Sequence, residues 1–190
     1  MKDVLKKVWH FIWVDGSILS WIVNAALAFL LVKFIIYPLL GMVLGTSYPV
    51  VAVISGSMEH NGLGFDAWWE SNKGWYLQND ISKEELDESI FRNGFNKGDI
   101  ILLLGAKPDD IDSLDVIVYN SDNYKYPIIH RIVTKENKGL EYIFTTKGDN
   151  NPGPDPAAIS PGRILGKAVF RIPLLGWVKI WFSELIGGMA

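Results

Sequence analysis

The pattern of the sequence changes at the segment Val50-Val51-Ala52-Val53-Ile54. Its short run of β-branched residues is typical of a buried strand. Five later segments have the same character: residues 99–104, 115–119, 128–134, 142–146 and 163–172. Residues 148–161 form a loop with four prolines. Several short strands separated by turns predict a mainly β domain over residues 48–172, rather than an alternating α/β fold.

Residues 18–44, which precede this domain, are almost wholly apolar. About 20 helical residues suffice to cross a bilayer, so we predict a transmembrane helix, with a buried core helix as the alternative. Pro38 is expected to end or kink that helix. Three lysines precede the span (Lys2, Lys6 and Lys7), and the next basic residue after the span is Lys73. The positive-inside rule therefore places residues 1–17 in the cytoplasm and the β domain outside.

Two further segments have open roles. Residues 61–98 are predicted to be an insertion, in which Ser82 and Glu85 form a capping box that opens a short helix to about Phe91. The aromatic residues ahead of that helix favour a small lid packed on the domain, with contact to membrane or substrate as the alternative. Residues 173–190 are apolar and only marginally long enough to span a bilayer. A second membrane segment, an interfacial helix and a core helix remain alternatives there.

The composition of the chain excludes several kinds of function. Its 190 residues suffice for one domain plus an anchor, and its mean hydropathy of +0.17 is high for a soluble domain. The net charge of -3, without a basic tract, argues against a nucleic-acid partner. Cysteine is absent and the three histidines are far apart in the sequence. We therefore expect no disulfide, no thiol nucleophile, and no metal or other cofactor.

Ser57 is the candidate nucleophile, in the segment Ser55-Gly56-Ser57-Met58-Glu59 that follows the first strand. A serine hydroxyl attacks effectively only when a base accepts its proton and donors stabilise the oxyanion. Gly56 allows the backbone to turn tightly, and the Ser55 hydroxyl is a candidate donor beside the Ser57 amide. A serine between small residues also occurs in ordinary turns, so the segment alone does not establish catalysis.

His130 is the candidate base because it is the only histidine in an apolar, strand-like setting. His60 competes with it, but its Glu-His-Asn-Gly surroundings predict a solvated loop, and His10 is excluded by the predicted topology. Asp149 and Asp155 share one loop, and either carboxylate can orient the imidazole. The alternative for Asp149 is ordinary turn chemistry.

Four segments together resemble type I signal peptidases of the archaeal and endoplasmic-reticulum branch. They follow an N-terminal anchor in the family's order: residues 55–59, 114–119, 127–133 and 146–151. The resemblance implies an antiparallel, barrel-like catalytic domain of coiled sheets. It also implies that Ser57 is the nucleophile and that His130 takes the place of the bacterial lysine base. Asp149 and Asp155 are then the candidate acidic partners of the histidine, and Ser55 supports the oxyanion by analogy with bacterial relatives.

The same resemblance implies a membrane-bound serine endopeptidase that removes N-terminal signal peptides from exported preproteins. Cleavage is expected after small residues at the first and third positions before the cut. The expected partners are signal-peptide-bearing preproteins, the lipid bilayer and the protein translocation channel. The expected location is the cell membrane or the endoplasmic-reticulum membrane, with the catalytic domain on the extracytoplasmic side. The alternative is a catalytically silent accessory subunit of a signal peptidase complex.

Overall fold

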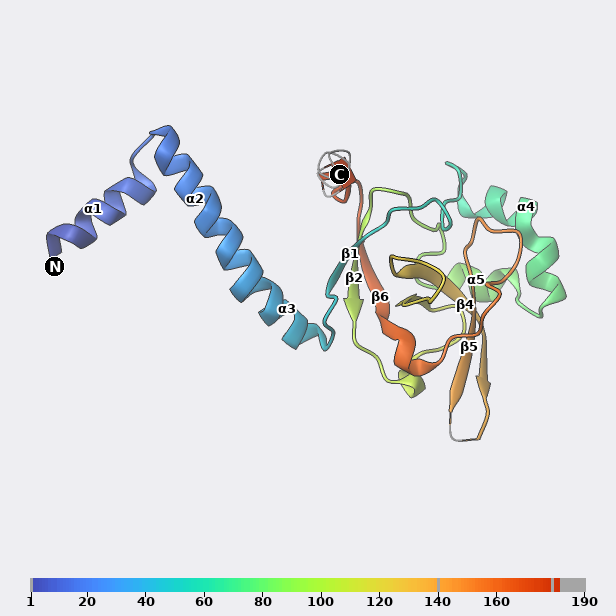
Figure 1. Ribbon diagram of the computed structural model, residues 1–190. Helices are drawn as coiled ribbons and strands as arrows, with labels where there is room; N and C mark the ends of the chain where they lie inside the picture. Colours follow the sequence, from blue (N-terminus) through green and yellow to red (C-terminus); the bar gives the residue numbers. More distant parts are fainter. Residues whose placement is uncertain (1, 140, 179, 182–190) are drawn as a thin grey trace. The chain divides into compact units, whose positions relative to one another are not determined.

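The computed structural model describes residues 2–139, 141–178 and 180–181. The chain divides into two units, residues 1–43 and residues 44–190. The first unit is helical and the second is built around one β-sheet (Figure 1). Most of the apolar C-terminal segment, for which three arrangements were expected, lies outside the described residues.

The N-terminal unit consists of helix α1 (Lys2–Trp13) and a longer helical stretch that begins at Ile18. This stretch comprises α2 (Ile18–Leu31), the π-helical segment η1 (Val32–Ile36) and α3 (Tyr37–Leu44). In the part of the chain that the structure describes, it is the one helix long and apolar enough to cross a membrane. The helix does not end at Pro38. A π-turn lies just before the proline, where the missing N–H and the ring disrupt the regular pattern.

The second unit contains six antiparallel strands in the order β1-β2-β6-β3-β4-β5. Their bounds are β1 (Val50–Ala52), β2 (Ile100–Leu104), β3 (Val116–Tyr119), β4 (Ile128–Asn137), β5 (Tyr142–Lys147) and β6 (Ile164–Ile172). Two 3₁₀ turns, η2 (Pro108–Asp110) and η3 (Pro161–Arg163), lie in the connections. Each strand lies in or begins in the segment predicted for it, which confirms the mainly antiparallel β fold. Two strands are longer than predicted, since β4 continues past residue 134 to Asn137 and β5 continues past residue 146 to Lys147.

The core of the sheet explains the apolar runs in the sequence. All four residues of β3 are buried, so other parts of the protein cover both faces of this strand. Every residue of β3 is accordingly apolar or aromatic. Its neighbours pack on it in two clusters of buried side chains. One cluster contains Val53, Met58, Phe95, Ile101, Leu103, Val116, Val118 and Ala168. The other contains Ile111, Ile117, Tyr119, Ile132, Phe144 and Ile159.

Two helices occupy the region between β1 and β2: α4 (Phe65–Gln78) and α5 (Lys83–Glu88). The capping box predicted for α5 is present, since Glu85 N–H donates to Ser82 Oγ at 3.2 Å and Ser82 N–H donates to the Glu85 carboxylate at 2.8 Å. That helix ends at Glu88, earlier than expected. The sequence did not predict α4, whose aromatic residues form a buried cluster with Val133 of β4. In Figure 1, α5 lies beside β4.

Candidate active site

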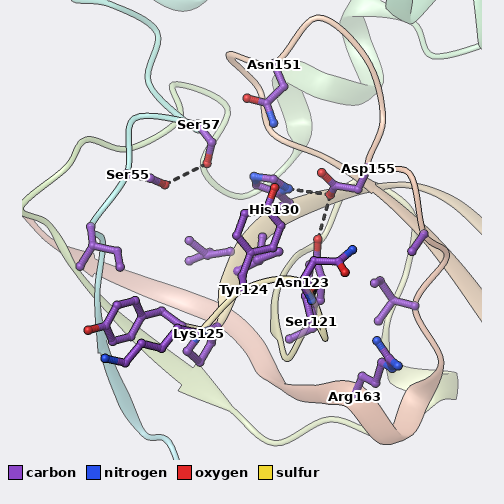
Figure 2. Close-up of a pocket in the computed structure, with 18 of the residues that line it drawn as sticks. Ser55, Ser57, Ser121, Asn123, Tyr124, Lys125, His130, Asn151, Asp155 and Arg163 are labelled. Carbon is purple, nitrogen blue, oxygen red and sulfur yellow. Dashed lines mark hydrogen bonds and ion pairs between the residues drawn. The ribbon is translucent and has the colours of Figure 1, made fainter.

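Ser57 lies in the loop that leaves β1, and the loop after β5 holds it in place. The Asn150 N–H donates to the Ser57 carbonyl oxygen at 2.8 Å, and the Asn150 side-chain amide donates to the Gly56 carbonyl oxygen at 3.1 Å. The next side chain, Met58, is fully buried and anchors the loop in the core. Ser57 Oγ lies 3.3 Å from Ser55 Oγ (Figure 2), so these two predicted site residues are in contact.

His130 lies on β4, opposite Ile117 of the central strand β3. Because successive side chains of a strand point to opposite faces, His130 and Arg131 lie on different sides of the sheet. The His130 side chain is largely buried, and its Nδ1 lies 2.6 Å from Asp155 Oδ2. Figure 2 shows the imidazole below Ser57, on the side of the sheet that carries Asp155.

Asp155 is surrounded by hydrogen-bond donors. Its Oδ2 accepts from Tyr119 OH at 2.8 Å and from Thr146 Oγ1 at 2.6 Å, in addition to His130. Its own N–H donates to the Thr146 carbonyl oxygen at 2.7 Å, which fixes the loop on β5. Partial burial opposes ionisation of this carboxyl, but the hydrogen bonds and charge of His130, together with Thr146 and Tyr119, lower the pKa of Asp155 below its ordinary value.

The tautomer of His130 follows from this arrangement. An ionised carboxylate can only accept hydrogen bonds, so the Nδ1 of His130 carries the proton that points to Asp155. Nε2 is then left with a free lone pair. This is the protonation pattern that a general base requires.

Gly148 shows how closely the serine loop approaches the histidine. A Cβ atom built on Gly148 would lie 2.7 Å from the Ser57 carbonyl oxygen and 2.9 Å from His130 Nε2. Such distances are too short for any side chain, so only glycine fits. Nε2 therefore points toward the loop that carries Ser57. Ser57 Oγ itself is hydrogen-bonded to Ser55 Oγ.

One cavity of about 320 Å³ connects these residues. Ser55, Ser57, His130 and Asp155 all line it (Figure 2), and most of the remaining wall is apolar. The apolar wall includes Ala52, Ile54, Ile128, Ile129, Pro156, Ala157 and Ile159. A concave, mainly apolar cavity with a few convergent polar groups is typical of a substrate site.

Asp149 lies on the opposite side of the sheet from His130. Its fully buried carboxylate accepts two hydrogen bonds from Arg131, from Nε at 2.9 Å and from Nη2 at 2.8 Å, and it contacts His60 Nε2 at 3.2 Å. Burial alone would raise the pKa of Asp149, but the Arg131 charge and these hydrogen bonds lower it to about 2. The structure thus brings Asp155 to His130, and Asp149 to Arg131.

His60 is not in a solvated loop, and that prediction is wrong. Its side chain is buried and stacks on Trp68 of α4, with ring centroids 4.0 Å apart and ring planes only 3° apart. Together with the hydrogen bond to Asp149, this stacking ties the inserted helices to the Arg131 side of the sheet. His60 does not line the cavity that contains Ser57.

Lys147 is a buried titratable residue that the sequence did not single out. Its Nζ donates to the Gly148 carbonyl oxygen at 3.0 Å and lies 4.9 Å from the centre of the Tyr76 ring. Burial disfavours its charged form and lowers the pKa of Lys147 to about 8. It shares a sheet face with Arg131, so it contacts the loop after β5 from the side of the sheet opposite His130.

Among the described residues, no three acidic or histidine side chains are placed to hold a metal ion.

The sequence was compared with those of known proteins. No protein-family model matches the sequence. The chain is 28% identical over 159 residues to the signal peptidase complex catalytic subunit SEC11 of Verticillium alfalfae, covering 80% of this chain and 73% of that protein. It is 29% identical over 163 residues to SEC11 of Lachancea thermotolerans, covering 80% and 76%.

The chain is thus similar to catalytic subunits of the endoplasmic-reticulum type of signal peptidase. Over a shorter stretch of 98 residues, identity to sec11 of Neurospora crassa rises to 36%, covering 47% of this chain and 57% of that protein. Relatives that align over 80% of this chain confirm the resemblance expected from four short segments. All of these signal peptidase relatives are named as catalytic subunits.

Proposed function

We propose that the chain is a membrane-anchored serine endopeptidase that removes N-terminal signal peptides from exported preproteins. The observation that carries the proposal is the convergence of Ser57, His130 and Asp155 on one apolar cavity. Similarity to catalytic subunits of signal peptidase complexes supports the same reaction. The long apolar helix Ile18–Leu44 supports anchoring in a membrane, which we propose to be the cell membrane or the endoplasmic-reticulum membrane.

In the first half of the reaction, Ser57 Oγ attacks the carbonyl carbon of the scissile peptide. The hydroxyl proton passes to Nε2 of His130, and Asp155 stabilises the resulting imidazolium through Nδ1. The carbonyl oxygen becomes an oxyanion, to which the Ser57 backbone N–H and the Ser55 hydroxyl are the proposed donors. When the carbon–nitrogen bond breaks, His130 returns the proton to the departing amine, and an acyl-enzyme remains.

In the second half, water attacks the acyl-enzyme while His130 accepts one of its protons. The second tetrahedral intermediate uses the same two oxyanion donors. Its collapse breaks the ester bond, and His130 gives the proton back to Ser57 Oγ. The signal peptide leaves with a new carboxyl terminus, and the enzyme is restored.

The shape of the site favours an extended substrate with small side chains near the cut. β1 is an edge strand of the sheet and leads directly to Ser57, so a substrate strand can pair beside it. Ala52 at its end and Ile54 just beyond it line the apolar cavity. This agrees with cleavage after small residues at the first and third positions. The catalytic unit is proposed to lie on the extracytoplasmic face, where preproteins emerge from the translocation channel.

A silent accessory subunit of a signal peptidase complex is the alternative. The hydrogen bond between His130 and Asp155 disfavours it, because a scaffold has no need of a base with its tautomer fixed. Cleavage of a model preprotein by the full chain in detergent separates the two, using wild type, Ser57→Ala, His130→Ala and His130→Lys. Product from wild type but not from Ser57→Ala or His130→Ala supports the peptidase. Equal cleavage by wild type and Ser57→Ala, with all proteins folded by circular dichroism, would overturn it.

A further inference from the structure

Helix α1 (Lys2–Trp13) has two chemically different faces. Viewed down the axis at 3.6 residues per turn, one side carries polar and charged side chains: Lys2, Asp3, Lys6, Lys7 and His10. The other side carries apolar side chains: Val4, Leu5, Val8, Trp9, Phe11 and Ile12. In a soluble domain, a helix with this pattern turns its apolar face to a core.

The described residues provide no core for α1. None of its residues is buried, and Val4, Leu5 and Trp9 are each about two-thirds exposed, at 64%, 65% and 65%. Trp13 at the end of the helix is 69% exposed. A contiguous apolar face of this size needs an occupant.

The chain bends between α1 and α2 (Figure 1), and polar side chains of the first turns of α2 contact the end of α1. The Ser20 hydroxyl donates to the Phe11 carbonyl oxygen at 2.5 Å, and the Asn24 side-chain amide donates to the Ile12 carbonyl oxygen at 2.8 Å. These are carbonyl groups of the last turn of α1, which have no partner within their own helix. Ser20 is fully buried at this contact. The bend between α1 and α2 is therefore a built feature, and it explains why Asn24 interrupts an otherwise apolar segment.

We propose that α1 is an interfacial helix that lies along the bilayer surface and binds anionic phospholipids. The proposal rests on the membrane anchoring proposed above. A helix that bends away from the end of a membrane span can lie in the lipid headgroup layer, with its apolar face in contact with the acyl chains. Three lysines against one aspartate give the polar face a positive charge that complements anionic headgroups. Trp9 and Trp13 have the amphipathic rings favoured at that depth.

The absence of cysteine from the chain allows a direct test, since one spin label can be placed at a single introduced cysteine. Val8→Cys and Lys7→Cys form a matched pair, with Val8 on the apolar side of α1 and Lys7 on its polar side, and Ala28→Cys reports on the middle of the span. The full chain is reconstituted in nanodiscs of phosphatidylcholine, with or without phosphatidylglycerol. Collision of each label with oxygen, which concentrates in lipid, is compared with collision with a water-soluble nickel chelate.

We expect the label at Val8→Cys to favour oxygen several-fold over nickel, as at Ala28→Cys, and the label at Lys7→Cys to favour nickel. Phosphatidylglycerol should increase the lipid exposure of the Val8→Cys label. Changing Lys2, Lys6 and Lys7 together to glutamine, in the Val8→Cys chain, should remove that increase.

Three outcomes would overturn the inference. Nickel access at both α1 positions would mean that the helix lies in water, and exclusion of both reagents at Val8→Cys would mean that protein covers the apolar face. The third outcome is that phosphatidylglycerol has no effect on the lipid exposure of the Val8→Cys label. Cleavage of a preprotein by the same labelled chains reports the proposed function separately. Continued cleavage with α1 in water would overturn only the interfacial helix, whereas nickel access at Ala28→Cys would remove the membrane anchor itself.

Discussion

Asp155→Asn should remove most peptidase activity while leaving the catalytic unit folded. The Asp155 carboxylate lies 2.6 Å from His130 Nδ1 and, being ionised, can only accept a hydrogen bond from it. An asparagine amide at the same place is neutral and therefore stabilises the imidazolium less. If its NH₂ group turns toward the ring, the proton must sit on Nε2, which then cannot accept the proton of Ser57.

The size of the effect follows from the role of the base. A positioned general base contributes about 10²- to 10⁴-fold, so kcat/KM should fall by that factor, which corresponds to about 3 to 5 kcal/mol of barrier. The fold should lose much less, because an asparagine whose oxygen takes the place of Oδ2 still accepts from Tyr119 and Thr146. We expect a loss of about 1 kcal/mol, which lowers Tm by about 2 to 4 °C.

Asp149→Asn is the matched control, since it makes the same chemical change six residues earlier. It leaves the fully buried Arg131 without its charge partner, which costs about 3 to 5 kcal/mol and lowers Tm by roughly 10 °C. The molecules that stay folded should keep kcat/KM within about tenfold of wild type. Preprotein cleavage and thermal unfolding are measured on both variants. Full activity in Asp155→Asn, with activity lost in a stably folded Asp149→Asn, would refute the assignment of the acids.

Three further outcomes are expected. Gly148→Ala should lose activity and stability because its Cβ would meet Ser57, whereas Gly153→Ala, with no atom within 4 Å, should behave as wild type in the same assays. The pKa of Asp149 is about 2, against an ordinary 3.8, so its carboxylate should stabilise the fold by about 2 kcal/mol above about pH 4. This stabilisation should be lost as the pH falls to about 2, and a urea unfolding midpoint that stays constant over this range would contradict the prediction. The pKa of Lys147 is about 8, against an ordinary 10.5, so between these pH values the folded state binds fewer protons than the unfolded state. The free energy of unfolding should therefore rise by up to about 3 kcal/mol from about pH 8 to about pH 10. This rise should be missing in Lys147→Met.

The strands were predictable because each is a short β-branched or apolar run between turn residues. Helix α4 was not, for a reason visible at its start. Its first residue is preceded by Gly64, whose lack of a side chain provides no capping hydrogen bond, while α5 begins with the complete capping box of Ser82 and Glu85. Gly74 and the clustered tryptophans of α4 are also weak helix signals. Only packing on the sheet identifies it as a helix.

The candidate site residues could be named from sequence, but their pairing could not. Asp149 and Asp155 belong to one loop, and their separation depends on how that loop crosses from one side of β5 to the other. Thr146 and Lys147 give the local rule, since adjacent strand residues face opposite sides: Thr146 contacts Asp155, and Lys147 lies on the Arg131 side. The register of β4 against β5 is a tertiary property that a single sequence does not reveal.

The environment of His60 was hidden for a similar reason. Its polar neighbours in sequence indicate a surface turn, and its actual partner, Trp68, lies on the unpredicted helix α4. The error therefore followed from the missed helix.

The central claim is that His130 ionises the nucleophile at position 57, and a thiol placed there measures this directly. Since the chain has no cysteine, Ser57→Cys introduces the only thiol, and its alkylation rate by iodoacetamide at neutral pH reports thiolate formation. Ser57→Cys should react at least about tenfold faster than the double variant Ser57→Cys with His130→Ala, because the imidazole takes up the thiol proton. Equal alkylation rates in the two folded proteins would contradict the proposed pairing of nucleophile and base.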